Sequence, residues 1–269
     1  MDASELYDPE FRKLIKSKKQ TVIIPVGSLE QHGAHLPITT DSDIVTEIAS
    51  RLGKKCGFIV FPTIGYGLSD EHSPLFNTTI LDPNLFVDYL SNIIVSLKQH
   101  IKNISIIILN GHHGNSITLE EYFDLYNNPG PASMEEYEEY LKDTGSDPLA
   151  GYTFEWFKAV RDKRTANPFK LFHYWHFMEH EFDHAGFVET SLMLAISNKV
   201  KIKKAKKGFT TKGLTQKEIQ KINKLSTQQG GFPQVTKNGV WGDPTDATKK
   251  DGQKFLTEIV RNLAKECQS

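Results

Sequence analysis

The sequence has little cysteine, almost no net charge and no long apolar run. Its two cysteines, Cys56 and Cys267, lie far apart and outside any Cys-x-x-Cys pair, which argues against a disulfide framework and a cysteine-based zinc site. The formal net charge of the 269 residues is -1, so no overall attraction to nucleic acid or to an anionic membrane is expected. No apolar run approaches the roughly 20 residues that span a bilayer, and the N-terminus lacks the apolar core of a secretory signal. We therefore expect a cytoplasmic enzyme or binding protein with no nucleic-acid or membrane partner.

Runs of apolar β-branched residues alternate along the chain with segments whose apolar residues are spaced as on one face of a helix. This alternation predicts an α/β fold, a layered α/β/α domain with a mostly parallel sheet. Predicted buried strands lie in 20–28, 56–67, 103–116 and 168–177, and predicted helices in 41–55, 81–101, 116–126, 186–198 and 248–266.

One stretch interrupts this regular pattern. Residues 127–167 are turn-rich, then acidic, then aromatic, and we interpret them as an insertion or lid within a single domain that spans 1–269. The basic segment 199–208, KVKIKKAKKG, is a second departure. A solvated loop explains it better than nucleic-acid binding does, because the chain as a whole carries no positive excess.

Polar motifs follow each predicted strand. GSLEQHG (27–33), GYGLSDEH (65–72) and NGHHGN (110–115) follow the first three, and DHAGFVET (183–190) opens a late helix. Ligands of parallel sheets bind at the carboxyl ends of the strands, so these motifs are expected to meet. Imidazole and carboxylate are the usual ligands of Zn and Mn, and the motifs therefore predict a metal site.

Each motif taken alone also has a simpler explanation. Glu30 and His32 could form a surface pair, Asp41 or Ser42 could cap the helix that follows, and residues 110–115 could form a tight turn. Glu189 is harder to explain in this way, because its helix is rich in apolar residues and an unpaired buried carboxylate is costly. A cation beside Glu189 would remove that cost.

Together the motifs resemble the creatininase (creatinine amidohydrolase) family. The resemblance rests on PVGSLEQHGAHLPITTD, FPTIGYGLSDEHSPLFNTTIL, NGHHGNS, HAGFVETS and GDPTDAT, which leave out the insertion and the basic segment. It implies a layered α/β fold, two divalent metal ions per chain (Zn or Mn), and a homo-oligomer, commonly a hexamer. It also implies hydrolysis of an amide-type C–N bond, often in a ring, by a water that the two metals activate. Other members of the family act on a formamide, on a peptide and on a keto-inositol.

The resemblance also suggests a role for each matching position. Glu30 and His112 would hold one metal, His32 the other, and Asp41 would bridge the two. At Gly114 the match fails, because creatininase proper has a metal-binding carboxylate two residues after the motif's histidine. The best replacement ligand is Glu189, which could instead shuttle protons.

The remaining polar positions divide into one catalytic residue and two supporting ones. The resemblance matches His184 to a catalytic histidine near the substrate, and we expect it to protonate the leaving nitrogen. His35 and His72 are expected to support the metal ligands from outside.

The sequence leaves the substrate open. A metal-dependent amidohydrolase of a small, cyclic molecule is the first hypothesis, and hydrolytic ring opening beside a ketone in a sugar-like molecule is the second. A non-catalytic binding protein on the same fold is the third. A set of aromatic residues could line the pocket or act as a lid, or could pack in the core or at a subunit interface. The set comprises Tyr152, Phe154, Trp156, Phe157, Phe172, Tyr174 and Trp175.

Overall fold

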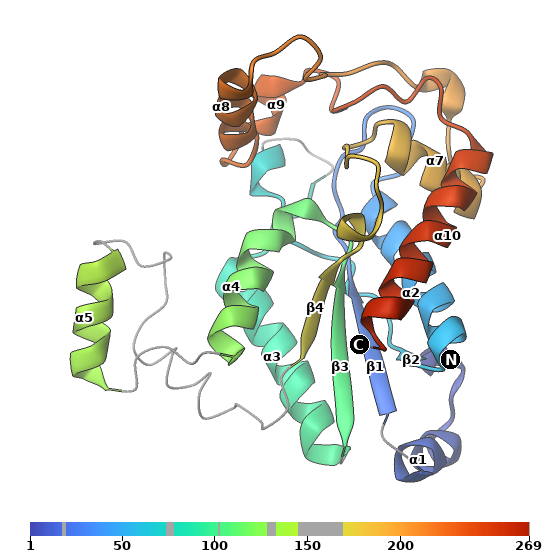
Figure 1. Ribbon diagram of the computed structural model, residues 1–269, viewed down its shortest axis with the longest axis vertical. Coiled ribbons are helices and arrows are strands. Elements are labelled where there is room, and N and C mark those ends of the chain that lie inside the picture. Colours follow the sequence, from blue (N-terminus) through green and yellow to red (C-terminus); the bar gives the residue numbers. More distant parts are fainter. Residues whose placement is uncertain (18–19, 74–77, 102, 128–132, 145–168, 269) are drawn as a thin grey trace.

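The computed structural model describes residues 1–17, 20–73, 78–101, 103–127, 133–144 and 169–268 (Figure 1). Its strands are β1 (Gln20–Val26), β2 (Ile59–Val60), β3 (Ile104–Asn110) and β4 (Lys170–His173). Its α-helices are α1 (Asp8–Ser17), α2 (Thr40–Cys56), α3 (Pro83–His100), α4 (Ser116–Asn127), α5 (Met134–Thr144), α7 (Phe187–Ile196), α8 (Gln216–Ser226), α9 (Phe232–Val235) and α10 (Lys249–Glu266). Its 3-10 turns are η1 (Ala3–Glu5), η2 (Asp70–His72), η3 (His113–Asn115), η5 (Tyr174–Phe177) and η6 (Ile202–Lys204).

The four strands form one parallel sheet in the order β2-β1-β3-β4. β1 and β3 pair along their whole length, with Ile23 opposite Ile107. β2 is much shorter than the predicted segment 56–67. After Phe61 N donates to Ile23 O, the next donor on β1 would be Pro25, which has no N–H, and the segment pairs with β1 again only at Ile64. The α/β prediction is confirmed.

Helices cover both faces of the sheet, which gives three layers (Figure 1). Side chains along a strand point alternately to opposite faces. Ile23 of β1 therefore packs with α2, α7 and α10 in one apolar cluster, whereas Val22 and Ile24 pack with α3 and α4 in the other. The two clusters hold the sheet rigidly between them, so its carboxyl edge is a fixed platform for the loops that follow each strand.

The start of α2 differs from the predicted one. Asp82 caps α3 as the sequence suggests, accepting hydrogen bonds from Asn84 N at 2.9 Å and Leu85 N at 3.1 Å. By contrast, α2 is preceded by Thr39, whose side chain makes no capping bond. The expectation that Asp41 or Ser42 caps this helix is therefore wrong, and Asp41 lies in the first turn with its carboxylate buried.

Much of the predicted insertion 127–167 lies outside the described residues, as do Tyr152, Phe154, Trp156 and Phe157. The part that is described contains α5. The extent of the domain and the role of the insertion stay predictions. Among the described helices, none is both long and apolar enough to cross a membrane.

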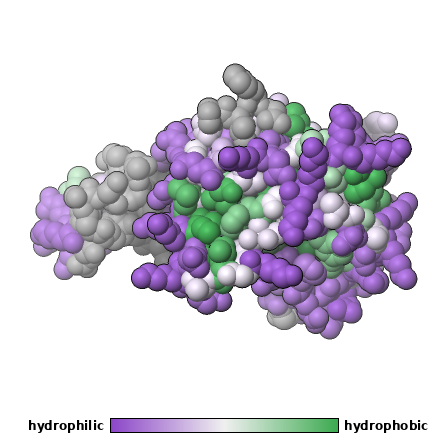
Figure 2. Space-filling model, turned by 90° about the horizontal axis from the view of Figure 1, so that it is seen from above, coloured by the Kyte–Doolittle hydropathy of each residue, from purple (hydrophilic) through white to green (hydrophobic). Residues whose placement is uncertain are grey.

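All four strands run in one direction, so their carboxyl ends meet at the upper edge of the sheet in Figure 1, below α8 and α9. Seen from above, this end of the molecule has hydrophobic side chains gathered in patches between hydrophilic ones (Figure 2). The side chains of the candidate site lie beneath this surface, since nearly all of them are buried.

Candidate metal centre

Loops at the carboxyl edge of the sheet bring the predicted site residues together. They supply Glu30 and His32 after β1, Asp41 in the first turn of α2, Glu71 and His72 in η2, His112 after β3, and His184 and Glu189 at the start of α7. The five predicted metal residues fall into two groups of three that share Asp41: Glu30, Asp41 and His112, and His32, Asp41 and Glu189.

Asp41 lies between the two groups and presents one oxygen to each. Its Oδ1 is 3.1 Å from His32 Nε2, and its Oδ2 is 3.0 Å from His112 Nδ1. Glu189 Oε2 adds a second carboxylate at 3.4 Å from His32 Nε2. Atoms bound tetrahedrally to one Zn at about 2.0–2.1 Å lie about 3.4 Å from one another, so these separations suit a shared cation shell on each side of Asp41.

Backbone carbonyls determine which nitrogen of each ring faces Asp41. The outer nitrogen of His112, Nε2, lies 2.6 Å from Leu68 O, and that of His32, Nδ1, lies 3.3 Å from Glu30 O. A carbonyl can only accept a hydrogen bond, so each outer nitrogen carries a proton. The inner nitrogens then face carboxylate oxygens, and a second proton or a cation has to lie between them.

Several buried polar atoms at this place also lack a hydrogen-bond partner. Within the described part of the chain they include both carboxylate oxygens of Glu30, Oδ2 of Asp41, Oε1 of Glu189 and Nε2 of His32. Buried polar groups without partners are rare in proteins, and they point to an ion or a water. Three carboxylates and two imidazoles with unused lone pairs are a donor set that fits Zn or Mn.

The pKa values show how strongly these groups interact when no cation is considered. Burial lowers the pKa of His112, but Glu30 and Asp41 outweigh that effect and raise the pKa to about 10. Burial also lowers the pKa of His32, which Asp41 and Glu189 nevertheless hold well above its usual value. For Glu30, burial raises the pKa, and His112 and His72 bring it well below the usual range. A metal ion has to replace these protons when it binds.

The start of α7 holds Glu189 in place. Glu189 Oε2 accepts a hydrogen bond of 2.6 Å from the backbone N–H of Ala185, a non-glycine residue with a φ of 53°. Asp183 accepts from Val188 N at 2.9 Å and Glu189 N at 3.3 Å, which closes the first turn of the helix. One oxygen of Glu189 is thereby oriented toward His32, as a ligand would be, and Oε1 remains without a partner.

His184 lies beside the two groups at the border of the buried region. Its Nδ1 is 3.6 Å from Glu30 Oε1, and its side chain is 13% exposed. Its Nε2 lies 3.0 Å from Gln31 O and 3.0 Å from Gln31 Nε2, so this nitrogen finds a partner whether or not it carries a proton. Burial and the neighbouring His32 lower the pKa of His184 well below its usual value, which leaves the ring neutral.

The structure adds Glu71 to the site, a residue that the motif analysis did not single out. Its Oε1 lies 3.7 Å from His112 Nε2 and 3.8 Å from His72 Nε2. It occupies space that Gly114 leaves open: a Cβ at Gly114 would lie 2.6 Å from Glu71 Oε1 and 2.4 Å from His112 Nε2. The glutamate in GYGLSDEH follows the second strand like the other site residues, so its position in the sequence was an available signal.

His35 and His72, which were expected to support the ligands, lie next to the site. His35 Nε2 pairs with Thr190 Oγ1 at 2.9 Å, behind His32, and burial lowers the pKa of His35 to about 4. His72 Nε2 lies 3.3 Å from Glu30 Oε1.

Aromatic residues surround the site, but the described members of the predicted group belong to the core. Tyr174 and Trp175 are buried in the cluster beneath α2 and α10, and Phe172 packs against that cluster. Trp175 also contacts His113, with ring centroids 5.7 Å apart. Phe232 of α9 packs on His184 at 4.9 Å. The core interpretation therefore holds for these three, and the ring that lies over the catalytic candidate is one that the sequence analysis did not name.

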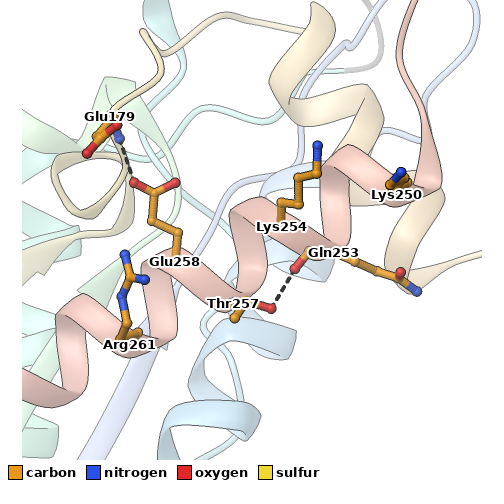
Figure 3. Close-up of a pocket in the computed structure, with 7 residues that line it drawn as sticks. All are labelled: Glu179, Lys250, Gln253, Lys254, Thr257, Glu258 and Arg261. Carbon is orange, nitrogen blue, oxygen red and sulfur yellow. Dashed lines mark hydrogen bonds between the residues drawn. The ribbon is translucent and has the colours of Figure 1, made fainter.

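A separate hollow of about 560 Å³ runs along the outer side of α10 (Figure 3). Charged and polar side chains line it. Glu179 N donates a hydrogen bond to Glu258 Oε1 of α10, and Thr257 Oγ1 donates to Gln253 O within that helix. None of the ligand groups of the described chain lies there. The chemistry is therefore concentrated at the carboxyl edge of the sheet rather than in this hollow.

Comparison with known proteins identifies the family to which this geometry belongs. The family model described as "Creatininase: Creatinine amidohydrolase" matches residues 4–267. The chain belongs to the creatininase family. It is 27% identical over 251 residues to the mycofactocin precursor peptide peptidase of Mycolicibacterium smegmatis, covering 90% of this chain and 82% of that protein. It is 27% identical over 199 residues to the creatinine amidohydrolase of Pseudomonas putida, covering 71% and 70%.

Solved structures of the creatininase family share the fold. The crystal structure of creatinine amidohydrolase (creatininase) superposes with a TM-score of 0.70 at 20% identity, over 98% of this chain and 95% of that one. Related structures include a "Zn-Zn type" mutant creatininase and "Creatininase Mn", with TM-scores of 0.70 each. The expected family and fold are confirmed.

The shared carboxylate gives a first prediction. We expect Asp41→Asn to weaken binding of both metals, by more than about 100-fold, because one carboxylate serves both groups. The free energy of unfolding of the metal-free protein should fall by about 3 kcal/mol, because the buried, protonated His32 and His112 lose their shared partner. Metal content after dialysis and chemical denaturation measure the two effects.

The matched control is Asp43→Asn, which changes a carboxylate of the same helical turn that pairs with Lys199 instead. Equal metal content in the Asp41 and Asp43 variants would contradict the bridging role.

The raised pKa values of His32 and His112 give a second prediction. Both rings hold an extra proton at neutral pH in the metal-free protein, so binding of Zn should release about two protons. Affinity should therefore rise with pH, until His112 loses its proton near its pKa of about 10. Isothermal titration calorimetry in buffers of different ionisation enthalpy counts the protons. Binding with no proton release would show that these rings are not the ligands.

Proposed function

We propose that this protein is a dinuclear metal-dependent hydrolase that cleaves a C–N bond, of the amide type and in a small cyclic molecule. The observation that carries the proposal is the position of Asp41, with one oxygen toward His32 and the other toward His112. Two divalent ions, Zn or Mn, held there by Glu30, His32, Asp41, His112 and Glu189 would lower the pKa of a water and polarise the carbonyl under attack.

His184 is the candidate for moving the proton in this reaction. Its neutral ring can take a proton from the attacking water through Nδ1 and deliver it to the leaving nitrogen. Its Nε2 lies 3.0 Å from Gln31 O, which can accept a hydrogen bond from this nitrogen when it carries a proton. Phe232 packs against His184 and shields this side of the site from water.

The narrow access to the site limits the size of the substrate. The ligand side chains are almost wholly buried, and Glu71 and His184 are the site residues with more exposed side chains, at 16% and 13%. A substrate would therefore approach past these two side chains. A compact molecule, or the end of a peptide, suits such an approach better than the middle of a folded chain does.

Two relatives favour alternative substrates. A peptide C–N bond is one, because the mycobacterial relative is a precursor peptide peptidase. Ring opening of a sugar-like ketone is another, because the chain is 29% identical over 182 residues to the 3-dehydro-scyllo-inosose hydrolase of Thermotoga maritima, covering 65% of this chain and 50% of that protein. A non-catalytic binding protein is less favoured, since the ligand groups on both sides of Asp41 are present.

The hexamer and the cytoplasmic location stay predictions. Exposed apolar side chains would suit contact with other copies of the chain; they include Tyr66, Ile80, Leu85, Tyr89 and Ile117.

The proposed activity is testable with one substrate panel. Zn-loaded and Mn-loaded protein should hydrolyse at least one member of a set of cyclic amides, formamides, short peptides and cyclic ketones. His184→Gln should lower kcat by about 10²–10⁴-fold, the usual contribution of proton transfer, while metal content stays the same. Equal activity of metal-free and loaded protein would contradict the proposal.

Creatinine itself should be a poor substrate. Gly114 replaces a carboxylate of creatininase proper, and Glu71 occupies the adjacent space, so charge and shape on the His112 side differ from those of that enzyme. Steady-state kinetics on loaded protein should give a kcat/KM below about 10⁴ M⁻¹s⁻¹, the lower end for enzymes on their own substrates. A higher value would show that Glu71 compensates for Gly114.

A further inference from the structure

His72 is a candidate metal ligand by distance alone. It groups with Glu30 and Glu71 within the spacing of a metal shell, and its Nε2 lies 3.3 Å from Glu30 Oε1. It is 2% exposed, like the histidines that we assign to the metals. Whether it binds a metal depends on which of its nitrogens carries the proton.

The side chain of Gln31 determines this. Gln31 Nε2 lies 3.1 Å from His72 Nδ1. The orientation of the amide is fixed, because its Oε1 accepts a hydrogen bond from Gly33 N at 3.0 Å, and the reverse orientation would set two donors against each other. The amide fits closely under Gly239, where a Cβ would lie 1.9 Å from Gln31 Oε1. Gln31 therefore donates, and His72 Nδ1 accepts.

This arrangement is the opposite of the one at His32 and His112. Their outer nitrogens meet carbonyl oxygens, which only accept, so the inner nitrogens offer lone pairs. The outer nitrogen of His72 meets a donor, so its inner nitrogen Nε2 carries the proton of the neutral ring. That N–H faces Glu30 Oε1, and a metal has no lone pair to bind there.

We propose that Gln31 holds His72 in the Nε2–H tautomer, which excludes His72 from the metals and makes it the donor that orients Glu30. In the metal-free structure His72 Nε2 and Glu30 Oε1 lie 3.3 Å apart without a hydrogen bond between them. We expect that bond to form when a metal holds the other oxygen of Glu30. Gln31 and His72 are thus positioning residues that act through Glu30. This role rests on the proposed metal function, but the tautomer itself does not.

Nitrogen-15 NMR of the metal-free protein tests the tautomer directly. Spectra recorded at a pH where the His72 ring is neutral should show it protonated at Nε2. In Gln31→Glu, whose carboxylate only accepts, the proton should move to Nδ1. The same tautomer in both proteins, or Nδ1–H in the wild type, would overturn the proposal. Gln253→Glu adds the same charge on the exposed side of α10 (Figure 3) and should leave the His72 signals unchanged.

A pair of variants at His72 separates a donor from a ligand. His72→Gln keeps an N–H donor but offers no imidazole, whereas His72→Leu removes both. We expect the leucine variant to bind Zn at least about tenfold more weakly than the glutamine variant, the smaller effect known for groups that orient ligands. If the two variants bind Zn equally weakly, His72 is a ligand and the proposal is wrong.

X-ray absorption of Zn-loaded protein gives a third readout besides activity. The number of imidazoles per Zn should rise in Gln31→Glu, because His72 Nε2 would then offer a lone pair to the metal. An unchanged number together with an unchanged tautomer would contradict the role of Gln31. Loss of Zn binding by the wild type would instead contradict the proposed metal function, while leaving the NMR result valid.

Discussion

The burial of Asp41 between two histidines is the constraint on which the rest of the site depends. Its carboxylate is withdrawn from water together with those of Glu30 and Glu189, and each such charge costs several kcal/mol unless it is paired. In the metal-free protein protonated imidazoles supply the pairing, as the raised pKa values of His32 and His112 show. Two divalent cations would supply it more completely. The rigid sheet between two apolar clusters is what keeps like charges this close together.

Hydrogen bonds outside the ligands determine what each histidine can do. Four histidines, at 32, 72, 112 and 184, surround the same carboxylates; the first three are buried and the side chain of His184 is 13% exposed. The outer nitrogens of His32 and His112 face the backbone carbonyls of Glu30 and Leu68. The outer nitrogen of His72 faces the side-chain amide nitrogen of Gln31. Nε2 of His184 faces both that nitrogen and the backbone carbonyl of Gln31. These partners divide the rings into two whose inner nitrogens can bind a metal, one whose inner nitrogen lies 3.3 Å from Glu30 Oε1, and one at the border of the buried region. Proximity to a carboxylate is by itself a poor guide to function here.

At Gly114 the site departs from the carboxylate that the resemblance to creatininase proper implies. The space beside Gly114 holds the carboxylate of Glu71, which comes from a different loop. Glu189 supplies the carboxylate that faces His32. Moving a charge from one loop to another changes the shape and charge of the approach to the metals, and relatives with different substrates are compatible with such differences.

The sequence by itself determined the layers, the parallel sheet and the ligand types, because strand periodicity and the carboxyl-end rule depend on local order and chain direction. It also pointed to Glu189, since an apolar helix does not bury a free carboxylate without a reason. Only the tertiary structure decided that Asp41 faces inward instead of capping α2, that Glu71 fills the space at Gly114, and that Gln31 is a donor to His72. The sequence around Asp41 would be the same if it capped α2, and the sequence around Gln31 would be the same if it did not donate to His72. Their roles depend on side chains and carbonyls from distant segments, such as Leu68, His112 and Gly239, and such contacts exist only once the chain has folded.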